Sequence, residues 1–399
     1  MDKNCIIYLG AVRDLAQYMR DWSLAYADII RELGYKVTIV DFSTDVKTLS
    51  ESLVKALSSD PKPSFVLSVH GYGYDLQVEN GQSIYDQCQI PFLALSLDNP
   101  MIYIESIKHE SRFTFWGLYD KSDLDYAIKY INPNKNYLFT PNAGFSSSSP
   151  PMPFHERDCD IMFCGTIFEP EEYRKSWKQF NIPHLATLCE AVVELLLSDN
   201  RKSLFEAMEE ALLCLGIFSL NGVGNNIHTI VNVVSFYVRG YRRMALLNEL
   251  AQAGMKIHCF GHKKQLEKLN HPNLVIHDFL YTREYLEALG RSKIVLNTTP
   301  NGKYSMTERQ LSAMMNGAAV ATDTNDYIEQ CFTGNTNIIG FSHKDYKALA
   351  DKLSYLLASP QKLEEIARNG EDAAKKNHTV RHRAADLIAV AEIGRELLS

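Results

Sequence analysis

Short apolar runs alternate with longer helical patterns over the first part of the chain. Residues 5–9 (CIIYL) precede a helical pattern over 15–33, and the next strand-like run is 36–40 (KVTIV). Two further apolar runs, 64–69 and 91–96, are each followed by polar or glycine residues. Because parallel strands deliver the residues after their carboxyl ends to one edge of a sheet, we predict an open parallel sheet covered by helices, with ligand-binding residues at that edge.

The composition changes at 141–157. This segment holds four prolines and four consecutive serines, a composition that neither a helix nor a central strand tolerates. We therefore predict a first Rossmann-like domain over 1–140 and an inter-domain linker over 141–157.

The alternation resumes with a strand-like run at 160–165, which opens a second Rossmann-like domain over 158–378. A long helical region of about 169–250 follows, and its apolar positions have the spacing of amphipathic helices, so we predict a helical insertion there. After it come four runs that predict a second parallel sheet, and then three helical segments. The four runs are 256–261, 273–277, 293–297 and 318–322, and the helical segments are about 343–358, 360–376 and 380–398.

Composition and charge narrow the class of protein. With 46% hydrophobic and 22% charged residues, the chain is not disordered, collagenous or a coiled coil. Its formal charge of −7, without a long basic run, argues against a nucleic-acid partner. The amino-terminal apolar run is too short for a signal peptide, and no run reaches the roughly 20 residues of a membrane-spanning helix. Since the eight cysteines are also scattered singly, we expect a cytoplasmic protein without a transmembrane segment or a metal site.

The most specific part of the sequence is 290–325. A strand-like run there ends in Leu296-Asn297, a Glu308-Arg309 pair opens a helical pattern, and the run after an Asn316-Gly317 turn ends in Thr322-Asp323. In this block, and more diffusely from 160 to 386, the chain resembles the group 1 glycosyltransferases. The resemblance is closest to the branch related to the spore maturation protein CgeB.

That resemblance implies an α/β fold of the GT-B type, with two facing Rossmann-like domains. It places the acceptor in domain 1–140, the nucleotide-sugar donor in domain 158–378, and a last helix over 379–399 that returns to the first domain. The implied enzyme is hexosyltransferase-like and transfers a sugar, from a UDP-sugar as the first expectation, to a hydroxyl or amide of a glycan, a protein or a small molecule. Bacterial glycan or protein glycosylation is the implied setting. The donor is a substrate, and neither a cofactor nor a metal is expected.

The helical pattern that starts at Thr307 has the chemistry of a phosphate site. The backbone N–H groups of 307–309 would point out of a helix N-terminus, where the helix dipole favours a pyrophosphate. Arg309 beside them would add a charge-assisted contact. The alternative is that Thr307 is only an N-cap, with Glu308 in a favourable first turn.

One departure from the family pattern leaves the stereochemistry open. The resemblance places Tyr304 and Ser312 where the retaining branch has two glutamates that contact the ribose and the donor sugar. Ser312 or Glu308 is left to make the ribose contact. Asp323 ends the following strand, where it is expected either to bind a sugar hydroxyl or to cap the next helix.

Further donor contacts are expected from the loops that follow the other strands of the second sheet. A glycine there lets a phosphate approach the backbone closely, because glycine has no Cβ. The expected contacts are Gly165 and Thr166 for the phosphates, Gly261 and His262 in the equivalent loop of the next strand, Phe279 and Tyr281 for the base, and Asn297 at the end of its strand. A core or capping role is the alternative for His262.

The first domain must supply a general base if the transfer is inverting. Asp98 and His70 each follow a predicted strand and are the two catalytic candidates, and Asp14 is a third. Asp98 precedes Asn-Pro, so a role as a turn residue is its alternative.

Two other functions stay open at this point. A nucleotide-sugar epimerase shares the GT-B architecture and needs no acceptor. A non-catalytic nucleotide- or partner-binding module would instead recruit its partner through the insertion at 169–250, whose helices would also suit a homo-oligomer.

Overall fold

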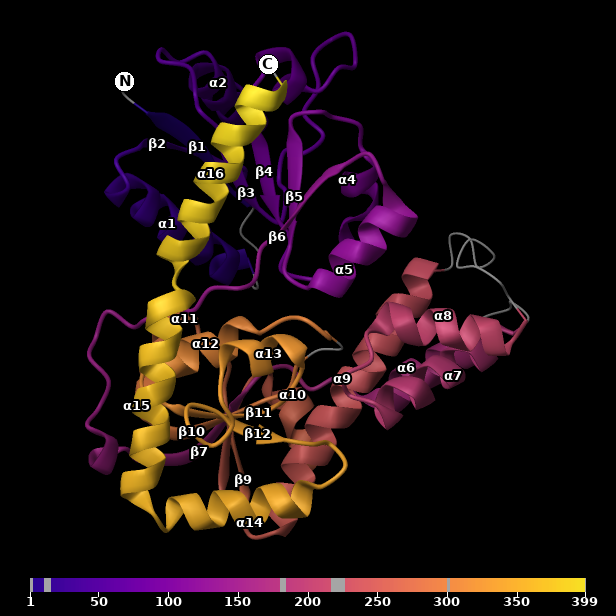
Figure 1. The fold of residues 1–399 in the computed structure, drawn as a ribbon, viewed down its shortest axis with the longest axis vertical. Helices are drawn as coiled ribbons and strands as arrows, with labels where there is room; N and C mark the ends of the chain where they lie inside the picture. Colours follow the sequence, from indigo (N-terminus) through magenta and orange to yellow (C-terminus); the bar gives the residue numbers. More distant parts are fainter. Residues whose placement is uncertain (1–2, 11–15, 180–183, 217–226, 300–301, 399) are drawn as a thin grey trace. The chain divides into compact units, whose positions relative to one another are not determined.

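The computed structural model describes residues 3–10, 16–179, 184–216, 227–299 and 302–398 of the chain. The third base candidate, Asp14, lies outside the described residues. The chain divides into two compact units, residues 1–143 with 379–399 and residues 144–378. Each unit contains one six-stranded parallel sheet covered by helices (Figure 1).

The first sheet has the strand order β2-β1-β3-β4-β5-β6, with all neighbours parallel. The chain moves outward from β1 to β2 on one side and from β3 to β6 on the other. The order therefore reverses between β1 and β3, and such a switch point is where open α/β sheets bind ligands. The strands are β1 (Asn4–Leu9), β2 (Lys36–Asp41), β3 (Val66–Val69), β4 (Phe92–Leu95), β5 (Thr114–Leu118) and β6 (Asn136–Phe139).

Helices cover both faces of the first sheet. The carboxyl-terminal helix α16 lies beside α1, and Gly394 gives the Phe115 ring room against it, since a Cβ at Gly394 would lie 2.5 Å from that ring (Figure 1). The side chain of Lys3 also forms an ion pair with Glu392 at 2.6 Å, which links α16 to the residue before β1. The helices are α1 (Ala16–Glu32), α2 (Val46–Leu57), α3 (Ile84–Cys88), α4 (Ile104–Lys108), α5 (Lys121–Tyr126) and α16 (Val380–Leu398).

The second sheet has the order β12-β11-β10-β7-β8-β9, again parallel throughout. Its switch point lies between β7 and β10. The strands are β7 (Cys159–Cys164), β8 (Ile257–Phe260), β9 (Leu274–His277), β10 (Ser292–Asn297), β11 (Ala319–Asp323) and β12 (Ile339–Phe341).

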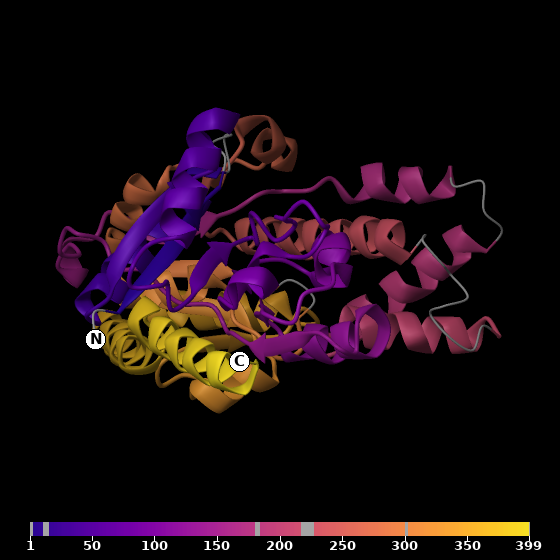
Figure 2. The ribbon, with the colours of Figure 1, turned by 90° about the horizontal axis from the view of Figure 1, so that it is seen from above.

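Two apolar cores flank the second sheet. One contains side chains of α9 and α14, the other contains side chains of α11 and α12, and α15 contributes to both. Helices α6 to α9 lie beside one another and extend away from this sheet (Figures 1 and 2). They are the helical insertion expected from the sequence. The helices are α6 (Pro170–Lys178), α7 (Leu185–Ser198), α8 (Leu204–Cys214), α9 (Ile227–Gln252), α10 (Lys263–Leu266), α11 (Thr282–Gly290), α12 (Glu308–Met315), α13 (Asp326–Cys331), α14 (Tyr346–Leu357) and α15 (Pro360–Asn377).

The sequence pattern misses three strands, β5, β6 and β12. Strand β6 is only half-buried along its length and β12 has three residues, so neither produces a clear apolar run. Strand β5 is fully buried, but its five residues Thr-Phe-Trp-Gly-Leu contain a glycine, which weakens a strand pattern.

Backbone hydrogen bonds hold the serine- and proline-rich segment after residue 143 against the second unit. The Phe145 N–H donates to Ser312 Oγ at 3.0 Å, and the Ser147 N–H donates to Asn316 Oδ1 at 2.7 Å. Further along, the Met152 N–H donates to the carbonyl of Gly290 at 3.1 Å. None of the helices in the described residues is both long enough and apolar enough to cross a bilayer.

Candidate functional site

The switch point of the second sheet brings together Gly165, which follows β7, and Asn297, which ends β10. A Cβ at Gly165 would lie only 3.0 Å from Nη2 of Arg309, so the bare backbone makes room for the guanidinium. A Cβ at Gly261 would lie 2.7 Å from the carbonyl oxygen of Gly165. The loop after β8 can therefore approach the backbone of Gly165 this closely because residue 261 is glycine.

Helix α12 starts at this switch point. Thr307 is its N-cap and forms a capping box with Gln310: the Gln310 N–H donates to Thr307 Oγ1, and the Thr307 N–H donates to Gln310 Oε1 at 2.7 Å. The side chain of Gln310 is fully buried and donates to Thr322 Oγ1 at 2.8 Å. The alternative role of Thr307 as an N-cap is thus present in the structure, and it fixes where the positive end of the α12 dipole lies.

Asn297 orients the arginine at that helix end. Its Oδ1 accepts from Nη1 of Arg309 and from the hydroxyl of Thr307, both at 3.1 Å. The Arg309 guanidinium carbon lies 5.9 Å from the centre of the Phe163 ring. A half-buried arginine is thus held in place beside Gly165 and the start of α12.

Helix α9 places Arg243 here and Arg239 one turn earlier, where the Arg239 guanidinium carbon lies 5.8 Å from the centre of the Phe168 ring. Arg243 is 6% exposed and donates to the carbonyl of Thr166 at 2.6 Å and to Thr298 Oγ1 at 3.3 Å. Burial, followed by the positive charges of Arg309 and Arg239, holds the pKa of Arg243 well below its usual value. Within the described residues, none of these three arginines forms an ion pair with a carboxylate. Positive charges gathered without a counter-charge favour an anionic ligand.

Sequence reasoning did not single out Arg239 and Arg243. The signal that points to them is their spacing of four on the otherwise largely apolar α9, which places both on one helix face. What the spacing cannot reveal is that this face reaches the switch point of the sheet.

Aromatic rings follow β8 and β9 at the same edge of the sheet. Phe279 and Tyr281 are 40% and 59% exposed. The Phe279 ring stacks on His262 with centres 5.5 Å apart and contacts Tyr281 edge-on at 5.6 Å. These three predicted residues are therefore neighbours and present planar surfaces to solvent.

Other predicted donor contacts are already engaged by the protein. Asp323 is 2% exposed, accepts from the Thr299 N–H at 2.6 Å and faces His343 Nε2 at 3.1 Å. Burial acts to raise the pKa of Asp323, but the hydrogen bond and charge of His343 outweigh it and leave that pKa below its usual value. The carboxylate is thus turned to these internal partners.

Ser312 is also engaged. Its fully buried hydroxyl donates to the Glu308 carboxylate and accepts from the Phe145 N–H. Tyr304, the second position of the departure from the family pattern, donates to the side chain of Gln330. The bond from Phe145 ties Ser312 to the segment after residue 143.

The two base candidates are neighbours in the first sheet. His70 follows β3 and Asp98 follows the adjacent β4, and the His70 N–H donates to the carbonyl of Leu95 at 2.8 Å. Burial lowers the pKa of His70, and the negative charge of Asp98 opposes this without cancelling it. The Tyr103 hydroxyl forms a hydrogen bond with His70 Nδ1.

Acidic side chains do not gather into a metal site in the part of the chain that the structure describes. The chain has two Asp-x-Asp triplets, at 123–125 and 158–160. Asp158 pairs with Arg291, and Asp160 pairs with Lys293 at 2.7 Å, at the beginning of β7. Asp123 is buried, and that burial raises its pKa well above the usual value.

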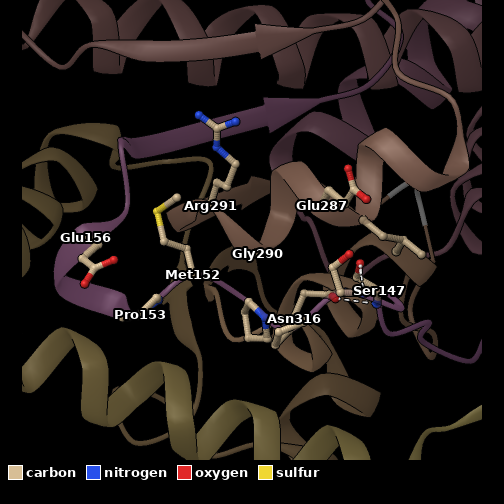
Figure 3. Close-up of a pocket in the computed structure, with 12 residues that line it drawn as sticks. Ser147, Met152, Pro153, Glu156, Glu287, Gly290, Arg291 and Asn316 are labelled. Carbon is tan, nitrogen blue, oxygen red and sulfur yellow. Dashed lines mark hydrogen bonds between the residues drawn. The ribbon is translucent and has the colours of Figure 1, made fainter.

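A cavity of about 450 Å³ lies elsewhere in the second unit (Figure 3). It is lined by the proline-rich segment 147–153, by Gly290 and Arg291 at the end of α11, and by Asn316 after α12. Strands β10 and β11 begin there, so the cavity is at the opposite edge of the sheet from the switch point. It contains none of the predicted site residues.

The comparison with known proteins agrees with the topology. Residues 242–389 match a family model described as glycosyl transferase-like. An α-glucosyltransferase solved with UDP and a 13-mer DNA is similar in structure, with a TM-score of 0.54 and 13% identity over 98% of this chain and 100% of that one. The fold is GT-B.

Two further GT-B structures support the same assignment. A sucrose-phosphate synthase from Thermosynechococcus elongatus aligns with a TM-score of 0.52 and 10% identity over 99% of both chains. A glycosyltransferase from Rickettsia africae aligns with a TM-score of 0.53 and 9% identity over 98% of both chains. No curated protein matches the chain. The GT-B fold class expected from the sequence, with two parallel sheets and a helical insertion in the second domain, is confirmed.

Proposed function

We propose that this protein is a glycosyltransferase that transfers a sugar from a nucleoside diphosphate sugar to an acceptor hydroxyl or amide. The observation that carries the proposal is the group formed by Arg239, Arg243 and Arg309 at the switch point of the second sheet. A diphosphate would supply the charge that this group lacks. The family match over 242–389, which includes Arg243 and Arg309, agrees with it.

The donor would lie along the carboxyl edge of the second sheet. Its diphosphate would meet Arg309, the start of α12 and the backbone of Gly165, where fixed dipoles and charges stabilise the departing group without a metal ion. The base would stack near Phe279 and Tyr281. UDP is the nucleotide we expect first, since UDP is bound in the similar α-glucosyltransferase.

For an inverting transfer, the first unit would supply the base. As the acceptor oxygen bonds to the anomeric carbon, its O–H bond breaks and the proton passes to a carboxylate such as Asp98. The bond from the anomeric carbon to the diphosphate oxygen breaks, and its electron pair leaves with the diphosphate. The CgeB-like branch, the hexose, the glycan or protein acceptor and the cytoplasmic setting remain predictions from the sequence.

The proposal is tested by thermal unfolding with UDP-, GDP-, CMP- and dTDP-sugars, each with and without EDTA. A ligand that binds only the folded state raises the melting temperature by mass action. We expect one nucleotide class to do so, equally with EDTA, and to release its nucleoside diphosphate when an acceptor is added. If no nucleotide sugar raises the melting temperature, the proposal is wrong. Epimerisation of the bound sugar without an acceptor would instead favour the epimerase.

A further inference from the structure

His70 has an unusual backbone and an unused nitrogen. It is one of the few residues other than glycine in the left-handed region, with φ of 64°, a conformation that is strained for a residue with a Cβ. Its ring packs against Tyr103 with centres 5.4 Å apart, and Gly71 directly after it makes room for Trp116. Nε2 of His70 is buried and has no hydrogen-bond partner among the described residues. A strained residue with a free polar atom indicates a binding role.

The proton on Tyr103 decides which nitrogen of His70 carries hydrogen. Tyr103 is 5% exposed, and burial raises its pKa well above the usual value, so the phenol keeps its proton. Because the Tyr103 hydroxyl is buried, its proton needs an acceptor. Among the described residues, that acceptor is His70 Nδ1. A buried hydroxyl proton left without an acceptor would destabilise the fold.

We infer that Tyr103 donates to Nδ1 of His70 and holds this histidine as the tautomer with hydrogen on Nε2. In that form Nδ1 is already occupied and Nε2 has no lone pair to offer. His70 is therefore a hydrogen-bond donor toward an oxygen of a bound sugar or phosphate, and it is not the general base. Tyr103 is a positioning residue that acts through His70.

Of the two base candidates predicted from the sequence, this inference favours Asp98 over His70. Asp98 is half-buried beside His70 and is left as the base candidate of the pair. The tautomer of His70 does not depend on the proposed function, whereas the role of its Nε2–H in transfer rests on that function.

The tautomer can be measured directly in the full chain. Protein labelled with ¹⁵N in histidine gives two-bond ¹H–¹⁵N correlations that distinguish a protonated ring nitrogen from an unprotonated one, and the His70→Gln variant identifies the His70 signals by their loss. At pH 7.5 we expect a protonated Nε2 and an unprotonated Nδ1. In Tyr103→Phe we expect the two nitrogens to move toward a mixture of tautomers.

Tyr74→Phe is the matched control, because the Tyr74 ring contacts His109 instead. It should leave the His70 signals unchanged. A protonated Nδ1 in the native protein, or an unaltered pattern in Tyr103→Phe, would overturn the inference whether or not the protein transfers a sugar.

Transfer kinetics then test the donor role. Glutamine places an amide N–H near the position of Nε2, so the kcat of His70→Gln should be at least tenfold higher than that of His70→Ala. The rate of His70→Gln should still fall at low pH, as in the native protein. In Asp98→Asn this fall in rate at low pH should disappear. Equal loss in His70→Gln and His70→Ala would contradict the donor role. A complete absence of transfer in the native protein would count against the proposed function and would leave the tautomer result standing.

Discussion

Replacement of Arg309 by methionine isolates the charge at the proposed diphosphate site. In the structure the guanidinium donates to Asn297 Oδ1 at 3.1 Å, and the same oxygen accepts from the Thr307 hydroxyl at 3.1 Å. Removing the guanidinium therefore leaves no buried acceptor without a partner, and methionine keeps the apolar stem near Phe163. Because a single hydrogen bond contributes about 1 kcal/mol, we expect the free energy of unfolding to change by no more than about that amount.

The expected effect on binding is larger. A hydrogen bond between a guanidinium and a phosphate oxygen contributes about 1.5–3 kcal/mol. Since a tenfold change in Kd corresponds to about 1.4 kcal/mol, UDP should bind roughly 10- to 150-fold more weakly to Arg309→Met. The loss should shrink at high salt, because screening already weakens the native contact.

Isothermal titration with UDP at two salt concentrations measures this difference. Arg283→Met is the control, since Arg283 is exposed on α11 and pairs with Glu287 at 3.0 Å. We expect the control to bind UDP as the native protein does. An unchanged Kd in Arg309→Met would place the diphosphate elsewhere, and an equal loss in both variants would mean that only overall charge matters.

Three further predictions concern the supports of this site and the first unit. Gly165→Val should weaken UDP binding at least tenfold in the same titration, because even a Cβ would lie 3.0 Å from Nη2 of Arg309. Gly240→Ala should lower the free energy of unfolding by about 1–3 kcal/mol, measured by urea unfolding, since its Cβ would lie 2.1 Å from the carbonyl oxygen of Phe168; equal or greater stability would refute this. Burial lowers the pKa of Lys135 to about 8, so between pH 8 and 10.5 the unfolded chain binds more protons and stability should rise with pH. Compared with Lys135→Met, which lacks this amine, the native protein should gain up to about 3 kcal/mol in the free energy of unfolding across that range, measured by urea unfolding. If the free energies of unfolding of the two proteins instead change with pH in the same way, the pKa of Lys135 is not lowered.

The strands that frame both switch points could be predicted from the sequence. Each is a short apolar run followed by glycine or a polar residue, as at 160–165 and 293–297. This local pattern can be recognised without knowledge of the tertiary contacts. The missed strands β6 and β12 lie at sheet edges, where half-burial and short length remove the pattern. Their recognition required the partner strand.

The candidate site was predictable only in part. The helix start at Thr307 and the charge of Arg309 can be read from adjacent residues, because capping and the helix dipole are local effects. The role of Ser312 could not be, because its partner Phe145 is 167 positions away in the chain. Asp323 follows a strand as a ligand-binding residue would, yet its pairing with His343 depends on how the segment after β12 returns to the sheet.

The sequence alone thus determined the fold class, the linker composition and the chemistry available at the carboxyl edges of the strands. Hydrophobic periodicity and turn residues act over a few positions, so a single sequence is enough to show them. The tertiary structure decided that Arg239 and Arg243 join Arg309, and that Tyr103 faces Nδ1 of His70. Those outcomes depend on long-range packing, in which burial removes water and leaves each charge or proton with only the partners that the fold supplies.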